Sequence, residues 1–236
     1  MQPFEITMKL ILINICICFI SALSFSQIYE IGGFIGGSNF IGDVGSTTYI
    51  NPNEPAFGGV IKWNRSQRHA FRASLIYTKL SANDVESSDP RRKLRGYSFS
   101  AGALEASLGI EFNFLDFDLH SAVPLTTPYL YTGISILNHP NFYFSSTDLV
   151  SEQTKSNTFG IPITLGLKTT LTPHIIVAIE VGARYSFSDS IDGNDPEPDN
   201  LKKRMRFGNF NNTDWYMFSG FTLTYTFGRK PCYCDF

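Results

Sequence analysis

The chain has 236 residues and a net charge of −2, and 17% of its residues are charged and 14% aromatic. A nearly neutral chain with so few charges lacks the basic stripe that follows a phosphate backbone, so nucleic acid is excluded as a partner. The two short basic runs, 91–93 and 202–204, lie beside acidic residues or glycine in segments that are predicted to be loops.

The N-terminus has the pattern of a secretory signal peptide. Lys9 precedes an apolar run over 10–20, and small residues follow it up to Ser26. This run is about half as long as a helix needs in order to cross a bilayer, so a cleaved signal is favoured over a helical anchor. We therefore predict a signal peptide over 1–26 and a mature chain that begins at Gln27.

The mature chain has no apolar run of about twenty residues, so any membrane crossing must use β-strands. Apolar and polar residues alternate, as in a strand, and the pattern is clearest over 159–168, 175–187 and 220–227. Weaker copies occupy 29–39, 57–64, 70–78, 98–114 and 128–136. The sequence thus predicts an all-β fold over 27–228, an eight-stranded antiparallel transmembrane β-barrel.

The connections between these strands alternate between short and long. Segments 64–69 and 171–174 are short and 115–127 is intermediate, whereas 40–54, 79–97, 138–157 and 188–213 are long and polar. Outer-membrane barrels have short periplasmic turns and longer extracellular loops. We therefore expect a protein of the bacterial outer membrane with both termini in the periplasm, and a periplasmic C-terminal tail over 229–236.

The face opposite the apolar one carries four acids and four bases. They are Glu30, Lys62, Arg72, Glu105, Glu111, Lys168, Glu180 and Arg184. The interior of an eight-stranded barrel is just wide enough for side chains, so we expect these groups to fill it as ion pairs and leave no pore.

Aromatic residues gather at the predicted strand ends, where membrane barrels have aromatic girdles. These are Trp63, Tyr77, Phe112, Phe114, Tyr185, Phe187, Trp215, Tyr225 and Phe227.

The sequence contains no catalytic constellation. Its four histidines stand in predicted turns or loops, and nucleophile-elbow, P-loop and zinc-protease motifs are absent. We predict a protein that is not an enzyme and has no cofactor, metal or small-molecule substrate. An enzyme that modifies outer-membrane lipids is the remaining catalytic alternative, with His139 or Ser145 as candidates. The acidic segment 189–200 offers oxygen ligands for a hard cation, but its spacing and two prolines favour a solvated outer loop.

Cys232 and Cys234 are the only cysteines of the predicted mature chain. A disulfide across one intervening residue is strained, so either the pair is reduced or one sulfur bonds another chain. Arg229, Lys230 and Pro231 stop the last strand just before them. The tail is therefore either a docking segment or a frayed end.

Several blocks together are similar to one known family. They are Tyr29-Glu30-Ile31-Gly32, the Gly-Gly-Ser-Asn-Phe-Ile-Gly-Asp block at 36–43, Asn51-Pro52-Asn53 with 55–58, and then 111–114, 128–133, 220–227 and Cys232-x-Cys234. Over essentially the whole mature chain, the sequence resembles the PorG-like outer-membrane proteins of the Bacteroidetes type IX secretion system. This resemblance implies an association, at the periplasmic face, with the ring of the lipoprotein PorK and of PorN. It also implies a role in protein export and, in gliding species, in motility, and it brings no catalytic residues.

The alternative is a generic small barrel of the OmpA type that acts as an adhesin, an envelope stabiliser or a lipid-modifying enzyme. Outer-membrane lipid is an expected partner in either case.

Overall fold

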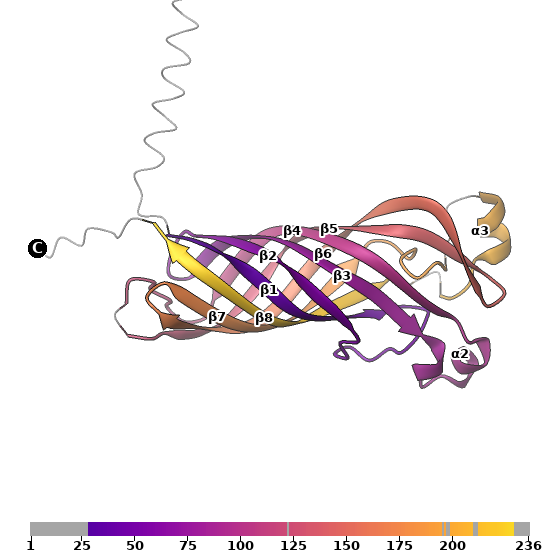
Figure 1. Cartoon of the computed structure of the whole chain (residues 1–236), viewed down its shortest axis with the longest axis horizontal. Coiled ribbons are helices and arrows are strands. Elements are labelled where there is room, and N and C mark those ends of the chain that lie inside the picture. Colours follow the sequence, from indigo (N-terminus) through magenta and orange to yellow (C-terminus); the bar gives the residue numbers. More distant parts are fainter. Residues whose placement is uncertain (1–27, 122, 195, 197–198, 210–211, 229–236) are drawn as a thin grey trace, which may run out of the picture.

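The computed structural model describes residues 28–121, 123–194, 196, 199–209 and 212–228. Its eight strands are antiparallel and form a closed barrel in chain order, with β8 beside β1 (Figure 1). The predicted fold class is confirmed. No helix in the described ranges is long and apolar enough to cross a membrane. The predicted signal peptide and C-terminal tail lie outside the described residues.

The strands are β1 Ile28–Ile41, β2 Glu54–Asn64, β3 His69–Asn83, β4 Ser98–Asn113, β5 Thr126–Ser145, β6 Asp148–Thr172, β7 Ile175–Ser186 and β8 Trp215–Phe227. Two of the predicted loops contain short helices. These are η1 Asp84–Glu86 and α2 Pro90–Arg95 between β3 and β4, and α3 Asp199–Met205 between β7 and β8.

The two ends of the barrel differ in their connections. Tyr29 of β1 is directly opposite Phe227 of β8, so the first strand begins where the last one ends. This terminal end also holds the three connections β2–β3, β4–β5 and β6–β7. The other end, called the loop end below, holds the remaining connections with α2 and α3 (Figure 1).

The prediction of a long polar loop over 138–157 is wrong. β5 and β6 instead continue as a paired hairpin up to Ser145 and Asp148, with a register shift between Pro140 and Phe142. The strand persists because Phe142 and Phe144 alternate with polar residues and bury their rings, with 5% and 2% of their surface exposed. Pro140, which has no N–H to donate, stands at the irregularity.

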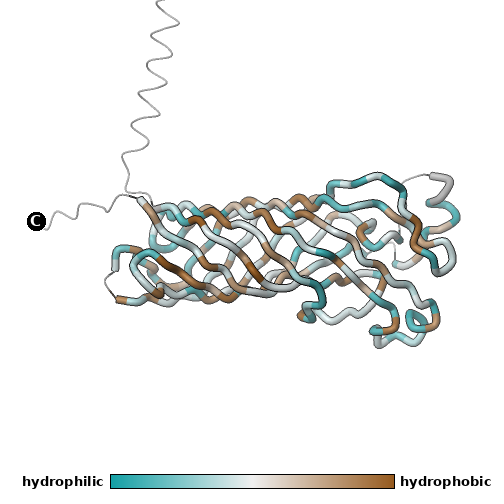
Figure 2. Tube along the Cα trace, in the orientation of Figure 1, coloured by the Kyte–Doolittle hydropathy of each residue, from teal (hydrophilic) through white to brown (hydrophobic). Residues whose placement is uncertain are grey.

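The outer wall of the barrel is apolar. Leucine, isoleucine and phenylalanine side chains on its strands are roughly half exposed, and hydrophobic positions concentrate on the wall between the two ends (Figure 2). Aromatic pairs mark both borders of this belt, with Trp63 against Phe71 at the terminal end and Phe57 against Tyr77 at the loop end. A soluble protein rarely exposes such a continuous apolar surface, whereas a spanning barrel presents it to lipid.

We expect Leu165→Arg to destabilise the barrel in bilayers by about 2–4 kcal/mol, because Leu165 is 60% exposed on the belt and a cation there would face hydrocarbon. Leu149→Arg is the matched control. Leu149 lies on the same strand and is 45% exposed, but it belongs to the hairpin beyond the belt. Reversible unfolding in lipid vesicles measures both variants, and equal losses would mean that the belt is placed wrongly.

Candidate functional site

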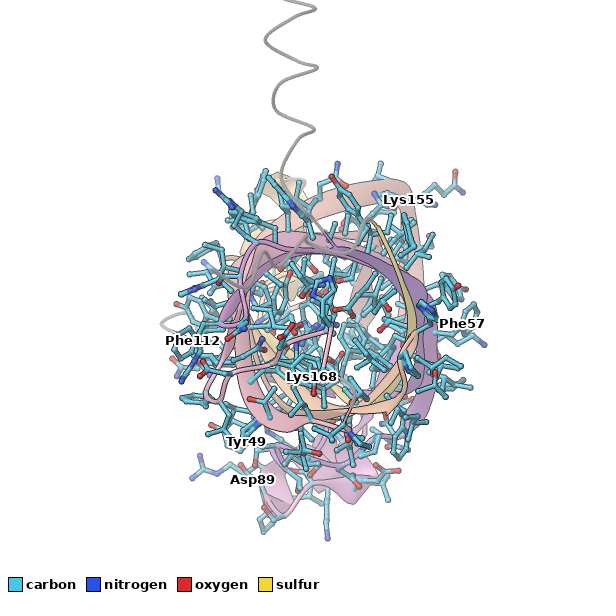
Figure 3. The ribbon with its side chains drawn as sticks, turned by 90° about the vertical axis from the view of Figure 1, so that its left-hand side faces the viewer. Tyr49, Phe57, Asp89, Phe112, Lys155 and Lys168 are labelled. Atoms are coloured by element: carbon cyan, nitrogen blue, oxygen red, sulfur yellow. The ribbon has the colours of Figure 1, made fainter. Side chains whose placement is uncertain are left out.

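The eight charged residues named above lie inside the ring of strands. All are at least 96% buried, and they come from six strands, β1 to β4, β6 and β7. In the view along the barrel axis, Lys168 is inside the ring whereas Phe57 and Phe112 point outward (Figure 3). Four carboxylates therefore share the lumen with four cations, and their charges balance.

Glu111 of β4 is the centre of the cluster. Its carboxylate oxygens lie 2.6 Å from Nζ of Lys168 and 2.8 Å from Nζ of Lys62, and Arg72 Nη1 is 3.8 Å away. Lys62 also faces Glu30, with 3.9 Å between Nζ and Oε2. Lys62 and Arg72 are directly opposite each other on β2 and β3, where two cations would repel. Glu111 offsets that repulsion because it reaches both of them.

Arg72 and Glu180 form a two-pronged ion pair across the lumen. Nη1 and Nη2 of Arg72 donate to the two carboxylate oxygens of Glu180 at 2.7 and 2.8 Å. The hydroxyl of Tyr129 donates to the same carboxylate at 2.5 Å. Parallel hydrogen bonds of this kind fix both direction and distance, so the pair joins β3 to β7 through the centre of the barrel.

Glu105 and Arg184 form a second group nearer the loop end. Nε of Arg184 lies 3.3 Å from both oxygens of Glu105, and Tyr216 donates its hydroxyl to that carboxylate at 2.7 Å. The Arg184 guanidinium also donates to Thr164 and lies 4.7 Å from the ring centre of Phe218. All the eight charges predicted to face inward thus have partners in the lumen.

Tyrosines complete the network, and the sequence analysis did not find them. Tyr129 and Tyr131 are fully buried, and the guanidinium of Arg72 lies 4.8 Å from the Tyr131 ring centre. Gly166 leaves room for the ring of Tyr129, since a Cβ there would come within 2.4 Å of it. Gly182 leaves room for Arg184 in the same way. Glycine on the inward face, beside a bulky inward residue of the neighbouring or the same strand, is the signal that could have revealed this packing.

Apolar side chains close the lumen on both sides of the charges. Phe117, from the β4–β5 connection, is buried with its ring centre 4.7 Å from Nζ of Lys168, toward the terminal end. Toward the loop end, an apolar cluster includes Phe34, Phe99 and Phe144. Only charged residues were predicted for the interior from the sequence, so this cluster is an addition of the structure.

The acidic loop is partly buried, contrary to its prediction as a solvated loop. Asp192 accepts hydrogen bonds from the backbone N–H groups of Asp43 and Val44, and Asp214 accepts one from Ile191. Burial, with the charge of Asp43 nearby, raises the pKa of Asp192 to about 7. Burial and the charge of Asp192 also raise the pKa of Asp214. The Asp192 carboxyl thus ties the β1–β2 loop to the β7–β8 loop, and Asp214 makes its bond within the β7–β8 loop.

Other residues that the sequence singled out form no reactive site in the described part of the chain. His139 is buried with Nε2 3.0 Å from the hydroxyl of Thr158, and Ser145 ends β5 at the hairpin turn. Among the described residues, no three His, Cys, Asp or Glu side chains are grouped to hold a metal ion. Cys232 and Cys234 lie outside the described residues.

One protein-family model matches residues 8–236, which is nearly the whole sequence. The chain belongs to the family described as "Domain of unknown function (DUF6089)". A search of curated proteins gives no match.

Solved structures with a similar arrangement are outer-membrane proteins. Ail of Yersinia pestis, in complex with a heparin analogue, is 9% identical, with 86% of this chain and 100% of that chain covered and a TM-score of 0.47. The N-terminal β-barrel domain of Pseudomonas aeruginosa OprF is 11% identical, with 86% and 98% covered and a TM-score of 0.43. OprG of the same organism is 10% identical, with 86% and 97% covered and a TM-score of 0.42.

We expect Arg72→Met to destabilise the DUF6089 barrel by about 3–5 kcal/mol, because it leaves the Glu180 carboxylate buried without a cation. A double variant, Arg72→Met with Glu180→Gln, should recover most of this loss, since it removes both charges and keeps an acceptor for Tyr129. Urea unfolding in lipid vesicles measures the two free energies of unfolding. If the double variant is as unstable as Arg72→Met, the loss of stability comes from packing rather than from the unpaired charge. A negligible loss in Arg72→Met alone would indicate a hydrated lumen.

The filled lumen also predicts that the barrel conducts no ions. Purified protein in planar bilayers should give no steady current, because ion pairs and aromatic rings occupy the space that a pore needs. A trimeric porin in the same bilayers provides the positive control. Stable ohmic conductance of porin size would contradict the closed interior.

Proposed function

We propose that the protein is a non-enzymatic scaffold of the bacterial outer membrane that serves the type IX secretion system. In this proposal its periplasmic face associates with the ring of the lipoprotein PorK and of PorN. The resemblance to PorG-like proteins, carried by the first-strand block and the Cys232-x-Cys234 tail, names this system. The apolar belt with its two aromatic borders supports the membrane location.

The blocked lumen is the observation that carries the scaffold part of the proposal. Glu111, Arg72 and Glu180 cross the centre of the barrel with their partners, so neither an exported protein nor a small solute has a path between the strands. A barrel without an open channel can still hold other components of the system at a fixed depth in the membrane. Its contribution to export would therefore lie in the contacts of its ends.

The terminal end is the surface that we assign to the ring. It carries the short β2–β3 and β6–β7 turns and both ends of the barrel chain, as the periplasmic end of an outer-membrane barrel does, whereas the loop end carries the long β7–β8 connection over 187–214. The tail that holds Cys232 and Cys234 continues from this end. Thiol exchange with a neighbouring subunit would relieve the strain of a bridge within the tail, provided that a partner cysteine is within reach.

An adhesin is the second candidate function, and the β5–β6 hairpin favours it. This hairpin carries the two strands to Ser145 and Asp148, past the pairing of β6 with β7 that ends at Gly160. The polar side chains of β6 between Ser151 and Asn157 are mostly exposed. A stiff, polar projection on the cell surface is suited to recognition, because it presents its side chains in a fixed arrangement.

Deletion and co-purification distinguish the two functions. If the scaffold proposal holds, a deletion strain stops secreting proteins that carry type IX signals, and the solubilised barrel co-purifies with PorK and PorN. Under non-reducing conditions, envelopes trapped with an alkylating agent should show a larger species that disappears on reduction and in the Cys232→Ser, Cys234→Ser double variant.

Leu94→Ser is the control for this experiment, because Leu94 is 89% exposed at the loop end and should leave the complex intact. Intact secretion after deletion, with reduced attachment of cells to surfaces, would favour the adhesin. A ring complex that is lost with Leu94→Ser and kept without the cysteines would invert the proposed orientation.

A further inference from the structure

We propose that α2 binds the phosphorylated saccharide headgroups of glycolipids in the outer leaflet. The proposal relies on the outer-membrane orientation argued above, but not on a role in secretion. It rests on three properties of the β3–β4 loop: its position beside the barrel wall, its height above the belt, and the division of its cations into two that hold the helix in place and two that make no ion pair with a described residue.

The β3–β4 loop projects sideways from the barrel. α2 lies at the loop end, off the side of the ring of strands (Figure 1), and Asp89, which caps it, lies outside the outline of the barrel in the end view (Figure 3). Tyr49 of the β1–β2 loop lies outside the outline as well (Figure 3). In a membrane, the surface below such an overhang is the headgroup layer of the surrounding lipid, so α2 must face those headgroups.

Two arginines bind α2 to the β1–β2 loop and to η1. Nη1 of Arg92 donates to the backbone carbonyls of Gly42 and Gly45 at 2.9 and 3.0 Å. Arg95 makes an ion pair with the buried carboxylate of Asp84 at 2.8 Å and donates to the carbonyl of Asp43. These contacts hold the short helix in place, so its remaining side chains are presented from a fixed position.

The remaining side chains of α2 are cationic and apolar, with Arg91 and Lys93 on either side of Leu94 rather than on one common face. Arg91 and Lys93 are exposed, and neither makes an ion pair with a described residue. Leu94 beside them is 89% exposed, and Val85 of η1 is 65% exposed. Exposed cations without an ion-pair partner are attracted electrostatically to an anionic lipid surface. Apart from the Arg95–Asp84 pair, the loop keeps three cations, Arg91, Arg92 and Lys93, against two carboxylates, Glu86 and Asp89.

The height of α2 selects the class of lipid. β3 runs six residues past Tyr77, the aromatic border of the belt, which raises Asn83 by roughly 15 Å along the axis for a strand tilted by about 40°. A phospholipid headgroup extends only about 5–8 Å beyond the hydrocarbon. The anionic groups that meet Arg91 and Lys93 must therefore stand on a taller headgroup, as phosphates on a saccharide core do.

The test uses purified, folded mature protein in detergent, titrated with a lipopolysaccharide that has a phosphorylated core, with bound lipid counted by native mass spectrometry. We expect the double variant Arg91→Gln, Lys93→Gln to bind roughly 30-fold more weakly, since each cation near an anionic surface contributes a factor of about five. The same lipopolysaccharide after removal of its phosphates, and phosphatidylglycerol, should bind the wild-type protein no better than this variant.

Lys203→Gln with Arg204→Gln is the matched control. It removes the same two charges from exposed side chains of α3, which lies at the far tip of the loop end (Figure 1), and should keep the wild-type affinity. Equal weakening by both double variants would reduce the effect to net charge and overturn the proposal. Undiminished binding by the α2 variant, or equal binding of the dephosphorylated lipid, would overturn it as well. PorK and PorN are absent from this experiment, so its failure leaves the secretion proposal standing.

Discussion

The structure depends on the neutralisation of four buried carboxylates by four buried cations inside one ring of strands. A charged group taken out of water costs several kcal/mol, and that cost is offset only where a partner and further hydrogen bonds are in place. Glu111 meets this condition with two lysines, and Glu180 meets it with Arg72 and Tyr129. Because each cation serves more than one acid or aromatic ring, the cluster acts as a unit and closes the lumen.

The same cluster fixes the register of the strands. Successive side chains of a strand point to opposite faces, so a slip by one residue would turn a lumen charge toward lipid and a belt residue inward. Both errors are costly, because hydrocarbon cannot hydrogen-bond the charge and the lumen has no space for a second apolar layer. The apolar belt alone would define only which face is outside. The ion pairs between β3 and β7 and between β4 and β6 also define which residues meet across the barrel.

The alternation of apolar and polar residues along the chain was sufficient to predict the number of strands, their order and the inward set of charges. It indicates directly which face of a strand each residue occupies. It could not predict where strands continue beyond the membrane. At Phe142 and Phe144 the inward face becomes apolar, so the contrast between faces fades and the hairpin resembled a loop. Inward tyrosines such as Tyr129 were missed for a related reason. Aromatic rings also occur on the lipid-facing side of the strands, so a tyrosine does not indicate its face. Only the hydrogen bond from the Tyr129 hydroxyl to the buried Glu180 carboxylate shows that it points inward. The burial of Asp192 depends on backbone donors from a loop about 150 residues away, which no local pattern contains.

A closed lumen confines the function of this barrel to its two ends, and these ends are built differently. The loop end is held together by buried aspartates, by an aromatic cluster and by Arg92 and Arg95, which fasten α2 to the β1–β2 loop and to η1. The terminal end holds the short β2–β3 and β6–β7 turns and leads into the tail. If the tail contacts a periplasmic ring, force from that ring would pull the barrel along its axis. The apolar belt resists this displacement only because moving it out of the bilayer would expose apolar surface to water. An overhanging α2 that grips headgroups on the opposite side of the membrane would oppose the same pull directly. Two weak contacts on opposite faces, joined by a stiff and filled barrel, would therefore anchor a secretion ring better than either contact could alone.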